Sequence, residues 1–431
     1  MTNEAWIVFD LGFGDAGKGA TVDFLVRDLK ADLVVRHHGG GQAGHNVLTP
    51  CGRHHTFSQF GAGSFVPGVR TLLGPEFVFH PGALWMEFLH LKSLGLSDAL
   101  DRIQIDERAR VISPFQQASG RLRELLRGDL QHGTCGVGVG EAVMDSIHQE
   151  CDTIFVRDFA DLSLVVKKLS GQQLRKRLEF KHLPPCDDER SQIEYQLLSD
   201  PDCIERIVEL WRPVIERLCV LSPDAVKGEL TSASRIVFEG AQGVLLDQCF
   251  GFHPHTTWSD CTPRGAVSLL DGLTTKVYRM GVVRTYMVRH GPGPFPTYDP
   301  DSEWSRMERH NQNGGWQGPL RSGPIDLVLL RYALAACRGA DGLALTHFDR
   351  VPEAIPVCRS YRANGAVIHE LPLPNDLVEQ GRLTQLLETV EPIYELIGRD
   401  DFIELIENEL QVPVSLISTG PTYEDRRWRT L

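Results

Sequence analysis

The segment 12–19 reads GFGDAGKG and lies between a strand-like apolar run, residues 6–9, and a helix-like run, residues 20–25. It fits the pattern G-x4-G-K, with a glycine where Ser or Thr usually follows the lysine. Glycines let backbone N–H groups converge on phosphate oxygens, the helix N-terminus adds a positive dipole end, and Lys18 can reach terminal phosphates. The segment therefore predicts a phosphate cradle, with an ordinary tight strand–helix turn as the alternative.

Asp15 is an unusual residue for such a loop. A carboxylate beside phosphates is repelled unless a metal ion or a proton transfer uses it. Its functional interpretations are therefore a Mg²⁺ ligand or a base. The structural alternative is a helix N-cap, because aspartate is favoured just ahead of a helix.

Apolar runs that end at Gly or Asp recur along the chain and predict buried strands of a largely parallel sheet. Helical periodicity lies between them, as in residues 204–218. This alternation predicts an α/β fold: a single large layered domain over residues 1–431, P-loop-like, with a mostly parallel central sheet. The strand-like runs are residues 6–9, 71–73, 235–238, 342–345 and 414–417.

A charged segment at about 163–234, which contains Pro184-Pro185, is predicted to be a helical insertion with exposed faces. It contains no recognisable chemical motif.

Charge and cysteine spacing exclude several classes of protein. The 431 residues include 44 basic and 57 acidic ones, a net charge of −13, so no broad basic surface is available for nucleic acid. The N-terminus has no basic region followed by a long apolar one, and no stretch approaches the roughly 18 apolar residues of a membrane span. We therefore expect a cytoplasmic protein with no membrane partner. The ten cysteines form no CxxC pair, which predicts free, mostly buried thiols.

Two further glycine-rich turns follow strand-like runs. Segment 39–46 reads GGGQAGHN and contains His45, which by itself is more often a structural histidine. Segment 238–247 reads FEGAQGVLLD and contains Gln242, whose amide can donate and accept simultaneously. Such an amide suits a carbonyl next to a ring N–H.

These segments, taken in order, resemble the signatures of the adenylosuccinate synthetase family. The match continues through GPGPFPT at 291–297, DLVLLRY at 326–332, LTHFD at 345–349 and ISTGP at 417–421. The collinearity of seven motifs from residue 5 to about 421 is far more specific than any single glycine-rich loop. The chain is identified as a divergent member of this family.

The resemblance implies that GTP and Mg²⁺ phosphorylate the 6-oxygen of IMP, and that the amine of aspartate then displaces the phosphate. On this pattern Asp15 is the base that removes the ring N1 proton and is also a Mg²⁺ ligand. Lys18 holds the transferring phosphoryl group, and Gly44 offers its carbonyl to Mg²⁺. His45 stabilises charge on the 6-oxygen, and Gln242 orients the base. Positioning and charge neutralisation are what phosphoryl transfer requires.

Asp349 matches the residue of the family that reads guanine, so the resemblance implies that GTP is preferred over ATP. His347 stands where the family usually has Lys. The GTP-binding residues implied by the resemblance are Gly14, Gly17, Lys18, Gly19, Asp349, Ser418 and Gly420.

The substrate side departs from the family pattern. Ala16 replaces a Glu, Gln42 an Asn and Cys135 a Thr, and only Arg321 remains of a run of arginines. A hydrogen bond to a charged group contributes about 1.5–3 kcal/mol, so losing two costs roughly 3–6 kcal/mol. Arginines that could compensate are Arg157, Arg264 and Arg289. The substrate-binding residues implied by the resemblance are Gln42, Thr134, Cys135, Gln242, Thr257 and Arg321.

Family members are homodimers in which an arginine of the partner subunit reaches the IMP phosphate. Cys151 or a neighbour lies where that arginine is expected, so a homodimer is implied by the resemblance alone. Three functions fit these observations: a GTP- and Mg²⁺-dependent C–N ligase with altered substrates, a genuine adenylosuccinate synthetase of purine biosynthesis, or a GTP-binding homologue without catalysis.

Overall fold

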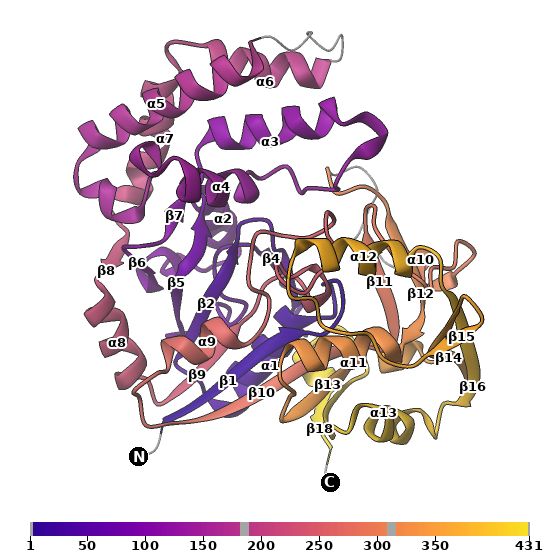
Figure 1. The fold of residues 1–431 in the computed structure, drawn as a ribbon. Coiled ribbons are helices and arrows are strands. Elements are labelled where there is room, and N and C mark those ends of the chain that lie inside the picture. Colours follow the sequence, from indigo (N-terminus) through magenta and orange to yellow (C-terminus); the bar gives the residue numbers. More distant parts are fainter. Residues whose placement is uncertain (1–2, 182–188, 308–315, 430–431) are drawn as a thin grey trace.

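The computed structural model describes residues 3–181, 189–307 and 316–429, which form one α/β domain on two sheets (Figure 1). The main sheet has the order β18-β17-β13-β10-β1-β9-β2-β5-β6-β8, with β7 paired to β5. All its pairs are parallel except β17–β18, which confirms the predicted fold class. Its strands are β1 (Asn3–Asp10), β2 (Leu33–Gly40), β5 (Arg70–Phe79), β6 (Ile103–Asp106), β7 (Arg110–Val111), β8 (Cys219–Leu221), β9 (Arg235–Glu239), β10 (Thr275–Arg284), β13 (Gly342–Thr346), β17 (Val414–Ser418) and β18 (Arg426–Trp428).

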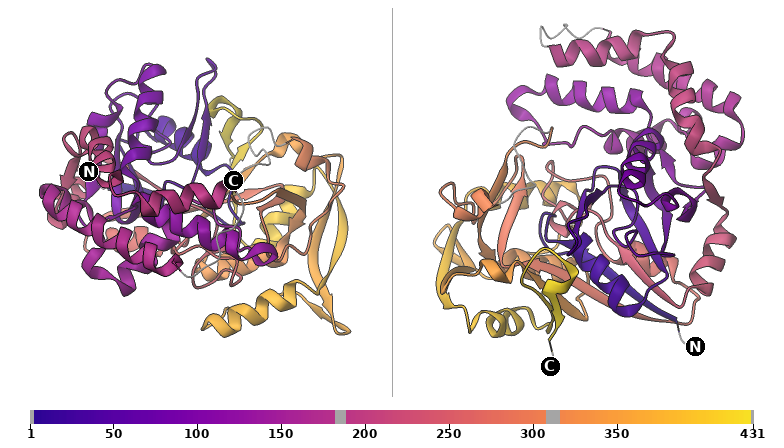
Figure 2. Two further views of the ribbon diagram at one scale, coloured as in Figure 1. Left: turned by 90° about the horizontal axis from the view of Figure 1, so that it is seen from above. Right: turned by 180° about the vertical axis from the view of Figure 1, so that it is seen from behind.

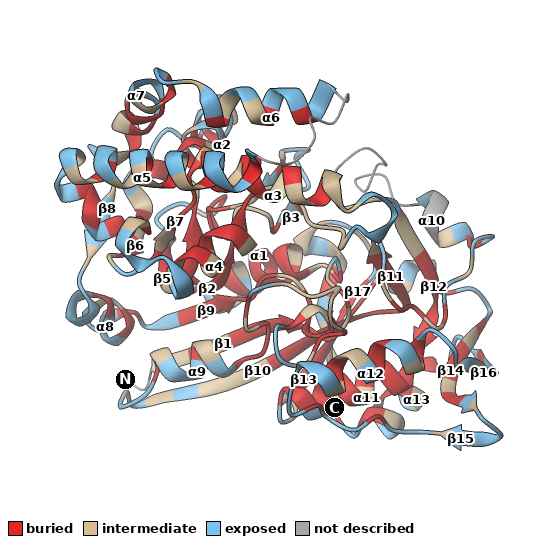
Figure 3. Cartoon of the chain, turned by 45° about the horizontal axis from the view of Figure 1, so that its top comes forward, coloured by how far each residue is buried: buried red, intermediate tan, exposed pale blue. Residues whose placement is uncertain are grey.

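The buried stretches of the central strands are mostly apolar because both faces of the main sheet are covered. In β1, Ile7 and Phe9 belong to one hydrophobic core, whereas Val8 belongs to the other. This division follows from the two-residue period of a strand. Figure 3 shows the buried residues concentrated along these strands and the exposed ones over the outer faces of the helices.

Helices cover both faces of the main sheet, and a group of helices lies beyond one end of it (Figures 1 and 2). The helices that precede β9 in the chain are α1 (Lys18–Leu29), α2 (Pro81–Ser93), α3 (Pro114–Leu126), α4 (Val139–His148), α5 (Leu162–Phe180), α6 (Glu189–Ser199), α7 (Cys203–Ile215) and α8 (Pro223–Ser232). The helices that follow β9 are α9 (Arg264–Leu269), α10 (Glu303–Met307), α11 (Leu327–Ala336), α12 (Leu377–Leu387) and α13 (Phe402–Leu410).

The charged segment at about 163–234 contains helices α5 to α8 and also one strand. Strand β8 pairs in parallel with β6 and so becomes the edge of the main sheet. The sequence showed only helical periodicity there, because a three-residue strand leaves too short a pattern to detect. Residues 182–188, with Pro184-Pro185 and Cys186, lie outside the described residues.

A second, mixed sheet stands beside the main one, with the order β11-β12-β14-β15 and β16 paired to β14. Its strands are β11 (Tyr286–His290), β12 (Leu320–Asp326), β14 (Ala354–Ala363), β15 (Ala366–Ile368) and β16 (Glu391–Gly398), and a separate hairpin joins β3 (His45–Leu48) to β4 (His54–Phe57). Strand β11 follows β10 after a single residue, so the second sheet begins at the carboxyl end of the first. Ligands of open α/β sheets bind at this end.

The nine described cysteines are all free, as expected. The expectation that most are buried is wrong: of the described cysteines only Cys203, Cys261, Cys337 and Cys358 are buried, whereas Cys51 and Cys249 lie in exposed turns and Cys219 in the edge strand β8. Among the described helices, none is both long enough and apolar enough to cross a bilayer.

The protein should lose stability below about pH 6.5, because His37 at the end of β2 folds in its neutral form. Its side chain is 2% exposed, and burial lowers the pKa of His37 to about 4. Between about pH 6.5 and about pH 4 the His37 imidazole binds a proton in the unfolded chain but not in the folded chain. The unfolding free energy should therefore fall as the pH drops through this window, by up to about 3 kcal/mol from this group.

Urea unfolding across this pH window measures the effect. The variant His37→Phe should show a shallower fall in unfolding free energy, whereas His148→Phe, at an exposed histidine, should keep the wild-type slope. A wild-type slope in His37→Phe would contradict the prediction.

Candidate active site

The loops after β1, β2 and β9 line one large cavity of about 1730 Å³. It reaches from the hairpin and α3–α4 on one side to the turns after β13 and β17 on the other. Every residue predicted for the site except Arg321 lines it: Gly14, Asp15, Gly17, Lys18, Gly19, Gln42, Gly44, His45, Thr134, Cys135, Gln242, Thr257, Asp349, Ser418 and Gly420. Segments more than 400 residues apart in sequence thus share one space.

The loop 11–17 is organised by Asp10, the last residue of β1. Its fully buried carboxylate accepts hydrogen bonds from the N–H groups of Gly12 (2.8 Å) and Ala16 (3.0 Å) and pairs with Lys18 Nζ at 2.9 Å. Helix α1 then begins with Gly17 as its N-cap, at φ 92°, without a side-chain cap. A residue with a Cβ is strained at this φ. The first N–H groups of α1 are therefore available at the cavity, as a phosphate cradle requires.

Asp15 is held out of that cradle toward the cavity. It has φ 58°, its carbonyl accepts a hydrogen bond from Arg284 (2.9 Å), and its carboxylate lies 3.2 Å from His290 Nε2. Burial raises the pKa of the Asp15 carboxyl, but the hydrogen bond and charge of His290, with the charges of Lys18 and Arg284, lower it further, so the net shift is downward. Asp15 is thus an ionised carboxylate at the cavity wall, and its interpretation as the N-cap of α1 is wrong.

His45 begins β3 and is held from behind by Glu239, the last residue of β9. The ring Nδ1 pairs with Glu239 Oε1, and both side chains are buried. The other ring nitrogen, Nε2, is buried and has no hydrogen-bond partner among the described residues. Since His45 lines the cavity, Nε2 is the atom that a substrate would meet.

Two glutamine amides also lack partners within the described chain. The amide atoms of Gln42 and Gln242 are buried without hydrogen bonds, and both residues line the cavity. Gln242 is kept close to the phosphate loop because a Cβ on the next residue, Gly243, would lie 2.2 Å from the Gly12 carbonyl oxygen. Unsatisfied buried amides are costly unless a ligand satisfies them, so both are candidate ligand contacts.

The far end of the cavity is formed by the turns after β13 and β17. Asp349 lies in a short 3-10 helix, Phe348–Arg350, and is exposed, and its carboxylate makes no hydrogen bond or ion pair with another described residue. Thr346 ties this turn to the phosphate loop by donating to the Ala16 carbonyl at 2.7 Å. Ser418 donates to the Gly420 carbonyl (3.0 Å), which shapes the opposite wall. A carboxylate so placed can accept two N–H groups from a purine edge.

Arg321 is the predicted residue that does not line the cavity. It lies opposite Arg289 across the β11–β12 pair, donates to the Gly293 carbonyl (2.9 Å) and lies over the rings of Phe295 and Tyr298. Tertiary packing turns this guanidinium toward the 291–296 loop, and its contact with substrate stays a prediction.

Arginines that could compensate for the missing ones do not converge on one space. Arg289 lines the cavity, but its guanidinium donates to the carbonyls of Pro292 (3.1 Å) and Pro294 (2.7 Å). Arg264 pairs with Asp260, and Arg157, which does not line the cavity, lies over Phe155. The segment that should hold a dicarboxylate thus offers no free guanidinium from these residues.

Sequence reasoning missed four residues of the site: Asp10, Glu239, Arg284 and His290. Asp10 and Glu239 had a usable signal, since each is an acidic residue that ends a buried strand just before a glycine-rich turn. Arg284 and His290 had none, because they reach Asp15 from a segment about 270 residues away.

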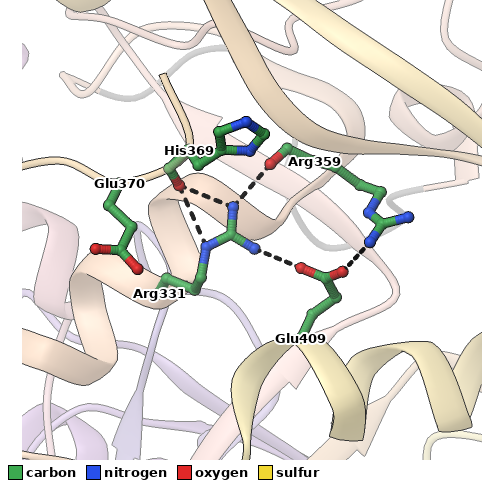
Figure 4. A pocket seen from close by; sticks show the side chains of 5 residues that line it. All are labelled: Arg331, Arg359, His369, Glu370 and Glu409. Carbon is green, nitrogen blue, oxygen red and sulfur yellow. Dashed lines mark hydrogen bonds and ion pairs between the residues drawn. The ribbon is translucent and has the colours of Figure 1, made fainter. Parts of the chain in front are cut away.

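A second, smaller cavity of about 290 Å³ lies away from this site, between α11, α13 and β14 (Figure 4). Glu409 pairs with both Arg331 and Arg359, and Arg331 also donates to the carbonyls of His369 and Arg359. These charges satisfy one another, so the cluster is a structural one.

A mostly parallel sheet with a glycine-rich strand–helix loop and one large cavity at the carboxyl ends of its strands is the arrangement of a nucleotide-binding α/β protein. A family model described as adenylosuccinate synthetase matches residues 7–427, so the chain belongs to the adenylosuccinate synthetase family. Members of this family are ligases that form C–N bonds with GTP, and this chain is an enzyme of that class.

Relatives and solved structures agree with this assignment. The adenylosuccinate synthetase of Clostridium botulinum (strain Langeland) is 30% identical over 442 residues, covering 97% of each chain, and that of Halothermothrix orenii is 29% identical, covering 96% of each. The structure of fully ligated adenylosuccinate synthetase from Plasmodium falciparum superimposes with a TM-score of 0.80 at 21% identity, covering 99% of each chain. The cyanophage S-2L succinoaminodeoxyadenylate synthetase, bound to dGMP and dATP, has a TM-score of 0.61 at 16% identity, covering 99% of this chain and 96% of that one.

Proposed function

We propose that this enzyme is a GTP- and Mg²⁺-dependent ligase that phosphorylates the 6-oxo group of an IMP-like purine nucleotide and displaces the phosphate with an amine, in pockets altered from those for IMP and aspartate. The observation that carries the proposal is a contrast within one cavity. Asp15, His45 and Gln242 face it together, whereas Arg321 faces the 291–296 loop and Arg289 is bonded to carbonyls.

Residues at the cavity wall support the phosphorylation step of this chemistry. Asp15 is ionised at the cavity wall, so it can take the ring N1 proton as the 6-oxygen attacks the γ-phosphorus of GTP. The unpartnered amide of Gln242 can hold the purine edge in register with Asp15. The N–H groups at the start of α1, with Lys18, can bind the phosphates and the transferring phosphoryl group, and His45, whose Nε2 has no partner among the described residues, can stabilise charge on the 6-oxygen.

Mg²⁺ fits the oxygen atoms offered here. It is bound in such sites by one or two carboxylates together with substrate phosphates, and the described residues contain no larger group of metal ligands. The Asp15 carboxylate is 38% exposed, and Gly44 is exposed at the same cavity. Asp15 and the Gly44 carbonyl would hold the ion, which supplies charge neutralisation at the phosphates.

The side chains expected to bind the amine substrate favour an amine other than aspartate. His255, whose carbonyl lies beside the Arg289 guanidinium, and His132, whose ring contacts the His255 ring, line the cavity next to β11. Burial lowers the pKa of His255 to about 4, so this histidine adds no positive charge. A dicarboxylate needs charged donors to replace its hydration, and these residues supply none.

The test is release of GDP and phosphate by the purified protein with GTP, Mg²⁺ and IMP, with aspartate in one reaction and a pool of other amines in another. Mass spectrometry identifies each product, and ATP replaces GTP in a parallel series to measure the preference expected from Asp349. We expect GTP-dependent product with another amine or another 6-oxopurine nucleotide, and aspartate turnover at least about a hundredfold poorer.

Efficient adenylosuccinate formation would contradict the altered pockets and identify a genuine adenylosuccinate synthetase. Bound but unreacted GTP with every substrate offered would contradict catalysis altogether. The homodimer and the contribution of the partner subunit belong to the same proposal, and Cys151 is exposed where that contribution is expected. Light scattering in the same buffers measures the oligomeric state.

A further inference from the structure

His347 lies in the turn after β13, at the same end of the cavity as Asp349, and has an unusual backbone conformation. Its φ is 61°, in the left-handed region that a residue with a Cβ seldom adopts. Its carbonyl accepts hydrogen bonds from the Thr285 hydroxyl (2.9 Å) and from the Arg350 N–H (3.0 Å), which hold the backbone in place. The direction of the His347 side chain is therefore fixed by the fold.

The Thr346 hydroxyl determines which ring nitrogen of His347 carries a proton. This hydroxyl has one proton and lies 2.7 Å from the Ala16 carbonyl oxygen, which can only accept. The Thr346 oxygen therefore accepts a hydrogen bond from His347 Nδ1, which lies 2.9 Å away. Because Nδ1 carries the proton, Nε2 of the neutral imidazole is an acceptor.

The surroundings keep this imidazole neutral and leave Nε2 open to the cavity. Burial lowers the pKa of His347 well below its ordinary value, and three nearby guanidinium groups lower it further, those of Arg284, Arg350 and Arg426. The ring packs edge-to-face against Tyr286, with the centroids 5.7 Å apart. Within the described chain, the imidazole makes its hydrogen bond at Nδ1 alone, and His347 lines the cavity. Nε2 is thus an acceptor that a bound ligand can use.

Guanine is the purine base whose hydrogen-bond donors match such an acceptor beside a carboxylate. It presents an N–H at ring N1 and two more on the neighbouring 2-amino group. The Asp349 carboxylate can accept two of these three groups. In the same turn, the Thr346 hydroxyl already donates to Ala16, and Arg350 can only donate. His347 Nε2 is the acceptor that the turn offers to the third group.

We propose that His347 is a specificity-determining residue of the nucleotide-donor pocket, whose Nε2 accepts an N–H of the 2-amino group of guanine beside the N–H groups accepted by Asp349. The inference rests on the proposed function for the pocket in which GTP binds. It deepens that function by naming the group of the base that is recognised and a residue that recognises it.

The variant His347→Asn removes Nε2 and keeps the rest of the arrangement. Asparagine is tolerated at a φ of 61°, and its side-chain N–H can still donate to the Thr346 oxygen. The measurement is calorimetric titration with Mg²⁺ and either GDP or IDP, which differ only in the 2-amino group. A site built to accept an N–H discriminates against the analogue that lacks it.

We expect the wild type to bind GDP at least about tenfold more tightly than IDP, and His347→Asn to lose about tenfold of that preference. The affinity of His347→Asn for IDP should stay within about threefold of wild type. Equal affinities of the wild type for GDP and IDP, or an unchanged preference in His347→Asn, would overturn the proposal. An equal loss of affinity for both nucleotides would show a purely structural role and would overturn it too.

Two further variants define the comparison. Asp349→Ala should weaken the binding of GDP and of IDP, because both bases carry the ring N1–H. His148→Asn, at an exposed histidine outside the cavity, should keep the wild-type preference.

The titrations require neither an amine nor turnover, so the two proposals can fail separately. Failure to form product with any amine, together with the expected change in preference, would contradict the proposed reaction and support the role of His347. Product formation with an unchanged preference would support the reaction and overturn this inference.

Discussion

Replacing Asp15 by asparagine is expected to lower kcat by about 10²–10⁴-fold. Asparagine keeps the shape of the side chain, but it cannot take the ring N1 proton and is a poorer Mg²⁺ ligand than a carboxylate. The φ of 58° at this position is tolerated by asparagine, so the loop should keep its conformation. GTP binding, measured by calorimetry without the acceptor nucleotide, should stay within about tenfold of wild type.

The control for Asp15→Asn is Asp106→Asn. Asp106 is a fully buried aspartate that pairs with Arg108 at the end of β6, away from the cavity. It should lose stability and keep kcat. Wild-type turnover by Asp15→Asn would contradict the assignment of Asp15 as the base and would fit a protein that binds GTP without catalysis.

Replacing Lys18 by methionine should lower both stability and turnover. Lys18 and Asp10 form a buried ion pair with side-chain exposures of 3% and 0%, so the substitution leaves the Asp10 carboxylate without its counter-charge. Removing one partner of a buried pair costs about 3–5 kcal/mol. Loss of a cationic contact to the transferring phosphoryl group should lower kcat by about a hundredfold or more. Urea unfolding and steady-state kinetics measure the two effects.

The matched control is Lys168→Met. Lys168 pairs with Asp158 at 2.6 Å in a largely buried site near η4 (Val156–Ala160), outside the cavity. This variant should be destabilised and retain turnover. Equal kcat in Lys18→Met and Lys168→Met, measured where both are folded, would show that Lys18 acts only through stability.

The strands could be predicted from the sequence because their signal is local. Residues 6–9 and 236–238 are apolar without interruption, as is typical of strands buried on both faces, and they lie within β1 and β9. The order of the strands could not be predicted in this way. Strand β10 pairs with β1 across about 270 residues, and nothing in either segment encodes the other as its neighbour.

The glycine-rich loop after β1 could also be predicted from the sequence, because a glycine-rich turn between a strand and a helix has few possible geometries. The roles of Asp15 and His45 depended on the resemblance, and the structure adds what stands behind them. His290 and Arg284 hold Asp15, and Glu239 holds His45. These contacts join segments that are distant in sequence, so no local sequence pattern predicts them.

Arg321 shows most clearly that the direction of a side chain cannot be predicted from the sequence. The sequence pattern predicts a substrate contact for it, and only the structure shows that its guanidinium donates to the Gly293 carbonyl in the loop after β11. The sequence by itself determined the family, the α/β class and the position of the glycine-rich strand–helix loop, because each depends on the short-range order of residue types. Only the tertiary structure decided which side chains meet at the cavity and which nitrogen of His45 faces it, because direction and hydrogen-bond partners are properties of the packed chain.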